Sequence, residues 1–119
     1  MIHELFNRKM KEFINDLIYI YPSVEDFKVL KVAFMAACVL DNKSPSIIFN
    51  SEVVQRYEDQ VMAKDEDFFM KESYDHVTES IDVIPKLKSI WQYLSDDNKE
   101  TIWKYMHVLV VLSKQCIKS

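Results

Sequence analysis

Apolar side chains recur every three to four positions along most of the chain, which is the spacing that lines one face of an α-helix. The breaks between these runs fall at proline, asparagine, aspartate and serine, which favour turns and helix ends. The runs predict helices over residues 2–20, 24–40, 45–63, 66–71, 79–94 and 96–117. We therefore expect an all-α fold, built as a single compact bundle of five to six helices.

The second run is distinctive because every residue from Val32 to Leu40 is apolar. A helix that is apolar on all sides is normally buried on all sides. This composition predicts that the helix over 24–40 is the buried central helix of the bundle. The long C-terminal helix over 96–117 should measure about 33 Å at 1.5 Å per residue, so we expect it to cross the whole domain.

Serine and proline mark the expected helix ends. Ser23, Ser44 and Ser95 each precede a helical run. They are predicted N-caps, since a serine hydroxyl can accept a hydrogen bond from a free backbone N–H in the first turn. Pro45 suits the first turn of a helix, where its missing N–H is not needed. Pro85 either starts the fifth helix or kinks it.

The chain has 119 residues, of which 49% are hydrophobic, and no glycine. That length is the size of one ordinary domain, so residues 1–119 are expected to form a single helical domain. Glycine supplies the positive φ angles of tight hairpins and of phosphate-binding loops. Its absence disfavours β-hairpins, P-loops and dinucleotide-binding turns, and we expect no cofactor.

The formal net charge is −4, and acidic and basic residues are mixed along the chain without a basic block. Binding to a phosphate backbone needs a concentration of lysine and arginine, and Arg8 and Arg56 are the only arginines. Nucleic acid is therefore a disfavoured partner. The alternative, a nucleic-acid-associated accessory factor, would need a basic patch along the last helix formed by Lys99, Lys104, Lys114 and Lys118.

Cysteine usage and hydropathy indicate the compartment. Cys38 and Cys116 lie inside apolar helical runs, where a free cysteine behaves as a small buried hydrophobe. The apolar stretch 32–40 is too short to span a bilayer. Met1 leads directly into an amphipathic run instead of a signal peptide. We expect an intracellular protein that is neither secreted nor membrane-bound.

The residues that could carry chemistry do not form a recognisable site. The three carboxylates at 65–67 could hold a divalent cation through oxygen, but they lack EF-hand spacing and are more simply read as the acidic first turn of a helix. A metal site at 65–67 with His76 is the lesser alternative. His3, His76 and His107 fall on different predicted elements. We assign no catalytic, cofactor-binding or metal-binding residues, expect no enzyme activity and disfavour a small-molecule substrate.

Four aromatic residues flank the loop between the last two predicted helices: Trp91, Tyr93, Trp103 and Tyr105. Tryptophan and tyrosine often supply the binding energy of protein interfaces, although at helical spacing they more often belong to the core. If they are exposed together, these four residues form the candidate interaction patch. We expect a protein partner or self-association, for which the C-terminal helix is the candidate element.

Several stretches carry a resemblance to a known family: FNRKMKEFINDL (6–17), YPSVEDFK (21–28), KDEDFFMKESYD (64–75) and LKSIWQYLSDDNKETIWKYMHVLVVLS (87–113). They are similar to an uncharacterised family of small all-helical proteins from large DNA viruses of algae and other protists in marine sequences. The resemblance covers most of the chain. It implies a viral origin and a place in the host cytoplasm or the virion, and it brings no activity and no site residues.

Together these features predict a non-enzymatic helical protein, either a viral accessory or structural component or a protein–protein interaction module. The nucleic-acid-associated factor and the divalent-metal-binding protein are the alternatives.

Overall fold

The computed structural model describes residues 2–67, 87, 88 and 90–118. These residues form helices and connecting turns, without a β-strand, which confirms the all-α prediction for this part of the chain. The elements are α1 (Ile2–Ile20), α2 (Glu25–Leu40), α3 (Ser44–Phe49), the π-helical turn η1 (Asn50–Val54), α4 (Gln55–Met62), the 3₁₀ turn η2 (Trp91–Tyr93) and α7 (Asp96–Lys118).

The described residues make four long helical segments, because α3, η1 and α4 follow one another without a break. Five to six helices were expected. The predicted helices over 66–71 and 79–94 fall largely on residues 68–86, which lie outside the described residues, as do His76 and Pro85. The long C-terminal helix is confirmed as α7, and it begins one residue after Ser95 as predicted.

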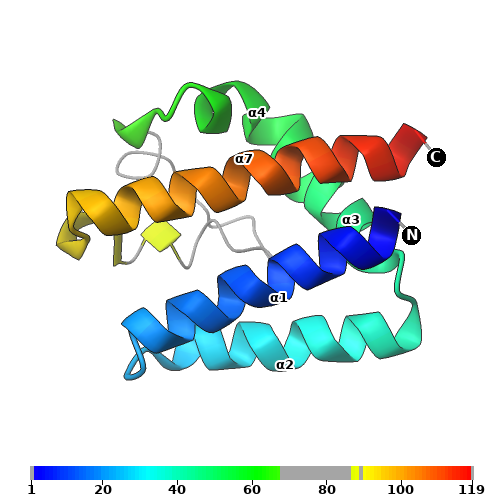
Figure 1. Ribbon diagram of the computed structural model, residues 1–119, viewed down its shortest axis with the longest axis horizontal. Helices are drawn as coiled ribbons and strands as arrows, with labels where there is room; N and C mark the ends of the chain where they lie inside the picture. Colours follow the sequence, from blue (N-terminus) through cyan, green and yellow to red (C-terminus); the bar gives the residue numbers. More distant parts are fainter. Residues whose placement is uncertain (1, 68–86, 89, 119) are drawn as a thin grey trace.

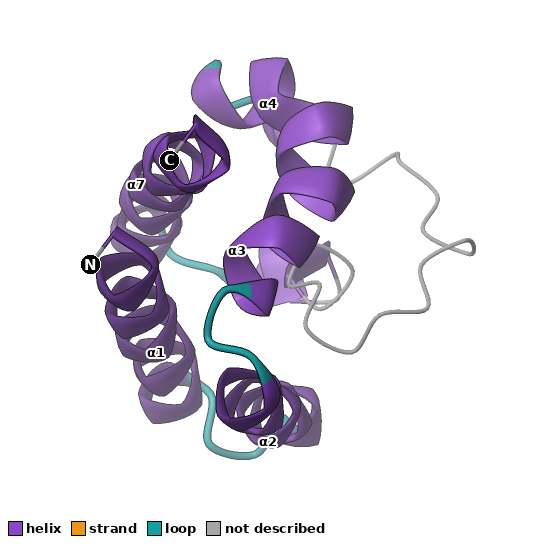
Figure 2. Cartoon of the chain, turned by 90° about the vertical axis from the view of Figure 1, so that its right-hand side faces the viewer, coloured by secondary structure: helices purple, strands orange, loops and turns teal. Residues whose placement is uncertain are grey.

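The other three segments are arranged around α7, which crosses the middle of the molecule (Figure 1). α1 runs antiparallel to α7 and packs along it, while α3, η1 and α4 contact its other side. α2 packs on α1 and α3, and it lies at the lower edge of the molecule in both Figure 1 and Figure 2. The radius of gyration of the Cα atoms is 13.3 Å.

The prediction that α2 is the buried central helix is wrong. α7 holds that position, with eight buried residues. In α2 only Phe27, Leu30 and Phe34 are buried. These three residues are spaced three and four apart and include the bulkiest side chains of α2, so they fill one side of the helix. The opposite side is equally apolar but faces solvent, which the uniform composition of 32–40 concealed.

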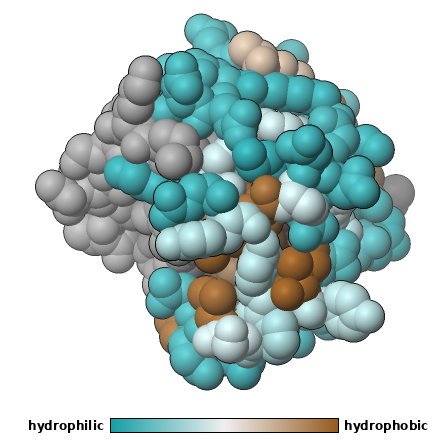
Figure 3. All heavy atoms as spheres, turned by 90° about the vertical axis from the view of Figure 1, so that its left-hand side faces the viewer, coloured by the Kyte–Doolittle hydropathy of each residue, from teal (hydrophilic) through white to brown (hydrophobic). Residues whose placement is uncertain are grey.

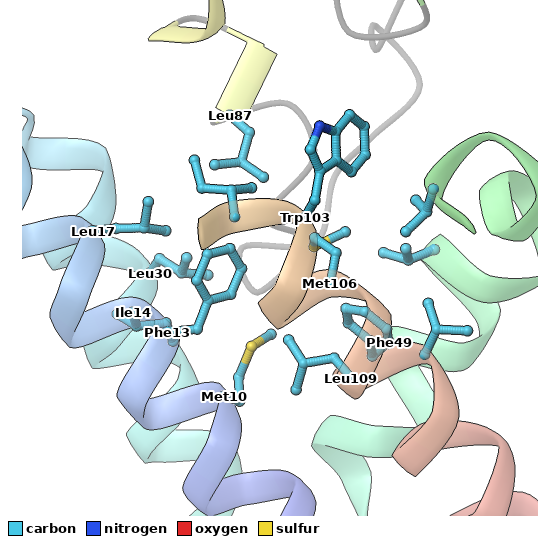
Figure 4. Packing of buried hydrophobic residues seen from close by; sticks show 14 of the residues in the cluster. Met10, Phe13, Ile14, Leu17, Leu30, Phe49, Leu87, Trp103, Met106 and Leu109 are labelled. Atoms are coloured by element: carbon cyan, nitrogen blue, oxygen red, sulfur yellow. The ribbon is translucent and has the colours of Figure 1, made fainter. Parts of the chain in front are cut away.

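A shared hydrophobic core joins the segments (Figure 4). Phe6 meets Phe49 edge-on with ring centroids 5.5 Å apart, which ties α1 to α3. Phe13 stacks on Tyr105 with centroids 5.0 Å apart, which ties α1 to α7. The core side chains seen in the close-up include Met10, Ile14, Leu17, Leu30, Leu87, Trp103, Met106 and Leu109.

The helix ends agree with the sequence at one of the three predicted caps. The Ser95 hydroxyl accepts a hydrogen bond from the Asn98 backbone N–H at 3.2 Å, as an N-cap does. α2 instead begins at Glu25, so Ser23 lies outside the cap position. Ser44 is already the first residue of α3, and its hydroxyl donates back to the Asp41 carbonyl at 3.0 Å.

Neither Cys38 nor Cys116 forms a disulfide. Cys116 is buried in α7, whereas Cys38 is half-buried on the flank of α2. Partial burial raises the pKa of the Cys38 thiol, and the nearby Lys11 offsets part of that shift. Among the described helices, none combines the length and the apolar character that crossing a bilayer requires.

Candidate functional site

The most exposed apolar surface of the described residues lies on the solvent side of α2. We call it the α2 outer face and define it by Val29, Val32, Met35, Ala36, Val39 and Leu40. Val39 and Leu40 are 85% and 86% exposed, and Val32 is 71% exposed. Large aliphatic side chains are rarely left so open in groups, so this face stands out from the singly exposed residues that any protein carries.

Helix geometry explains why these side chains form one stripe. Positions 29, 32, 36, 39 and 40 are separated by three, four, three and one residues, which keeps them on one side of the helix. That side is opposite the buried positions Phe27, Leu30 and Phe34. The same spacing is the seam pattern of paired helices. α2 has 16 residues, so the stripe follows a helix about 24 Å long at 1.5 Å per residue.

Charged residues stand only at the two ends of this stripe. Glu25 and Lys28 lie at its amino-terminal end, where their side chains are 3.7 Å apart. Asp41 and Lys43 follow its carboxyl-terminal end, where the Asp41 carboxylate accepts a hydrogen bond from the Lys43 backbone N–H at 3.0 Å. The residues from 32 to 40 contain no charge.

A shallow surface hollow lies at the amino-terminal end of the stripe. It is lined by Glu25, Lys28, Val29, Val32 and Ala33. Figure 3 views the end of the molecule at which α2 begins. Hydrophobic side chains gather toward its lower part, on the side where α2 lies in Figure 1, and the upper part is mostly hydrophilic.

The predicted aromatic patch does not assemble as one exposed surface. Trp91 and Trp103 are buried and meet edge-on, with ring centroids 5.1 Å apart. Tyr105 is half-buried against Phe13, and its hydroxyl donates to Asp16 at 2.5 Å. Only Tyr93 among the four is open to solvent, at 73% exposure. Whether it contacts a partner stays a prediction.

The acidic segment at 65–67 makes contacts within the chain. The Trp91 indole N–H donates to the Glu66 carboxylate at 3.0 Å, and Lys99 forms an ion pair with the same oxygen. The bonds from Lys99 and Trp91 lower the pKa of Glu66. The Asp65 carboxylate accepts a bond from the Asp67 backbone N–H. Within the described part of the chain, no three histidine, cysteine or acidic side chains gather as a metal site would require.

A histidine and a serine meet where α1 packs on α3, which the sequence did not indicate because they are 43 positions apart. His3 Nδ1 lies 2.9 Å from Ser46 Oγ. The Ser46 hydroxyl donates to the Lys43 carbonyl at 3.0 Å, and its side chain is wholly buried. The Ser113 hydroxyl in turn donates to the Ser46 carbonyl at 3.1 Å. These bonds join α1, α3 and α7, and no substrate could reach the serine without the helices parting.

The lysines of the last helix do not form a free basic patch. Lys99 pairs with Glu66, and Lys114 pairs with Glu58 at 2.7 Å. Lys104 and Lys118 are exposed, but 14 residues of helix separate them by about 21 Å. The charge density that a phosphate backbone requires is therefore not built by these four residues.

The α2 outer face was missed at the sequence level, although a signal for it is present. The bulky residues Phe27, Leu30 and Phe34 mark the inner side of α2 by their spacing. Once that side is identified, Val29, Val32 and Val39 must point the other way.

Comparisons of the chain with protein-family models, with curated proteins and with solved structures found no match.

Proposed function

We propose that this chain is a non-catalytic protein-interaction module and that the α2 outer face is its binding surface. One observation carries the proposal: a continuous apolar stripe on the side of α2 that the rest of the described chain leaves uncovered. From the exposed fractions, its large side chains present on the order of 600 Å² to solvent, which is the upper limit for the largest patch on a typical monomer.

Covering this surface is strongly favourable. At about 25 cal/mol per Å², removing some 600 Å² of apolar surface from water contributes roughly 15 kcal/mol before the entropy of association is subtracted. The rim also suits an interface, because charges at both ends of the stripe stay in contact with water while its centre is free of them. A partner of this face therefore has to present an apolar ridge or groove of similar length.

The non-catalytic part of the proposal is supported by how the polar groups are used. Ser46 is wholly buried, and its hydroxyl donates to a backbone carbonyl. Glu66 is occupied by Lys99 and Trp91. No specific observation on the described residues favours the metal-binding alternative or the nucleic-acid alternative. On the sequence resemblance alone, the setting we propose is intracellular, as a viral accessory or virion-associated component.

Site-specific photo-crosslinking in cells that express the chain tests this proposal. Benzoylphenylalanine is placed at position 39 on the α2 outer face and, as a matched control, at position 111 on α7. Val111 is a valine on a different helix and is also open to solvent, at 46% exposure against 85% for Val39. We expect a discrete protein adduct at position 39 that disappears when Val32→Glu is added. At position 111 the yield of any adduct should be much lower. Equal adducts at both positions, or none at either, would rule the surface out.

A further inference from the structure

We propose that the occupant of the α2 outer face is a second copy of this chain, with the two α2 helices packed antiparallel about a two-fold axis. This inference rests on the proposed function and names its partner. The reason for choosing a second copy is that the apolar stripe and its charged ends are complementary to themselves when one α2 is turned end for end.

Four of the apolar positions match in this arrangement. When the two-fold axis passes beside residue 34, Val29 faces Val39 of the second copy, and Val32 faces Ala36 of the second copy. A valine then opposes a valine or an alanine at each of these levels. Ala36 is exposed, and its small side chain lets the two helix backbones approach closely at the centre of the seam.

The charged ends also meet in the same register. Lys28 comes opposite Leu40 and near Asp41 of the second copy, and Glu25 comes near the turn that follows α2 of the second copy, which carries Asp41 and Lys43. The Glu25 side chain is 77% exposed, so it can reach a new partner. A parallel pair would instead bring Glu25 against Glu25 and Lys28 against Lys28, and it would align the helix dipoles unfavourably. The charge pattern therefore selects the antiparallel pair.

The position of α2 and the size of the stripe are compatible with such a dimer. α2 lies at the edge of the described structure (Figure 2), so two copies can meet there before their other described helices do. Pairing two stripes of this size buries about 1,200 Å² in total, the lower end of specific interfaces. We therefore expect a reversible dimer with a dissociation constant in roughly the micromolar range.

Sedimentation velocity of the full chain over a range of concentrations measures the dimer. We expect a monomer–dimer equilibrium in the wild-type chain. Val32→Glu places two carboxylates in the apolar seam and should weaken dimerisation by about 100-fold or more. Val111→Glu, on α7, should leave dimerisation unchanged within about twofold, and both variants should keep the helical circular dichroism spectrum because both positions are exposed. A wild-type chain that stays monomeric, or equal effects of the two substitutions, would overturn the inference.

Disulfide formation then tests the direction of pairing. Val32→Cys and Ala36→Cys are made separately, each with Cys38→Ser so that the half-buried native thiol does not compete. In the antiparallel pair, position 32 faces position 36, so the mixed sample should cross-link faster than either variant alone. If each variant cross-links with itself as fast as the mixture does, or if none cross-links, the antiparallel pair is excluded.

The two proposals fail in different ways. A monomeric chain whose position 39 cross-links to a different protein removes self-pairing and keeps the α2 outer face as a binding surface. A dimer that survives Val32→Glu, with no adduct at position 39, removes both.

Discussion

At the scale of single residues, Tyr105 joins α1 to α7 through both parts of its side chain. Its ring stacks on Phe13 and its hydroxyl donates to Asp16. Burial first, and then the hydrogen bond to Asp16, raise the pKa of Tyr105 far above its ordinary value. The fold therefore favours the neutral phenol, and the resulting stabilisation is complete below about pH 10 and is lost as the pH rises further.

Tyr105→Phe should keep the stacking on Phe13 and lose the hydrogen bond to Asp16, at a cost of about 1 kcal/mol in the free energy of unfolding near pH 7. Between about pH 10 and 11 the wild-type chain should lose stability more steeply than the variant, because only the wild type has this phenol to ionise. Urea unfolding at several pH values measures both effects. Tyr93→Phe, at an exposed position, is the control, and parallel pH profiles for wild type and Tyr105→Phe would contradict the assignment.

Glu66 links stability to pH at the acidic end. Hydrogen bonds from Lys99 and Trp91 lower its pKa, so the fold favours the carboxylate. This contribution is present above about pH 4.3, the ordinary pKa of glutamate, and is lost as the pH falls below that value. We expect Glu66→Gln to be less stable than wild type near pH 6 and to lose less stability on going to about pH 3. Asp59→Asn, an exposed carboxylate change on α4, should not show this difference in urea unfolding.

Local contacts could be predicted from the sequence, whereas contacts between elements could not. Ser95 caps α7 through a residue only three positions away, so its role is visible in the spacing. Tyr105 and Asp16 are 89 positions apart, and nothing in the spacing indicates that they meet. For the same reason, sequence spacing could not show that the two tryptophans of the candidate interaction patch are buried and that Tyr93 is exposed.

At the scale of elements, α2 offers a direct test of which of its sides is buried. Leu30→Ala removes a fully buried side chain and should cost about 3 kcal/mol in the free energy of unfolding. Val32→Ala, two residues away and 71% exposed, should change it by less than about 0.5 kcal/mol in the monomer. Chemical denaturation at low protein concentration, where the monomer dominates, gives both values. Comparable losses would mean that α2 is buried on both sides within one chain.

The wrong prediction that α2 is the buried central helix has a physical reason. The rule that an all-apolar helix is buried on every side does not say what buries it. Phe27, Leu30 and Phe34 are covered by α1 and α3 within the chain. In the dimer we propose, Val32 and Val39 on the other side are covered by a second copy. The composition of 32–40 would then satisfy the rule in the assembly while contradicting it in the single chain.

At the scale of the whole molecule, the fold class followed from the sequence but the packing order did not. Helical periodicity and the absence of glycine were sufficient to predict an all-α fold. Which helix is central depends on which faces meet, and several helices had apolar faces wide enough for that role. The π-helical turn at Asn50–Val54 was also not predicted, because a single changed hydrogen-bond register leaves the hydrophobic spacing nearly helical.

Self-pairing also couples folding to protein concentration. A second copy that binds the folded chain and not the unfolded chain stabilises the folded state by mass action. Raising the concentration of the wild-type chain from about its dissociation constant to about 100-fold above it should raise the thermal midpoint by roughly 5 °C. Val32→Glu should have a midpoint that does not change with concentration, whereas Val111→Glu should behave as wild type. Differential scanning calorimetry measures these midpoints, and a constant wild-type midpoint at concentrations where sedimentation detects the dimer would show that pairing does not depend on the folded α2 outer face.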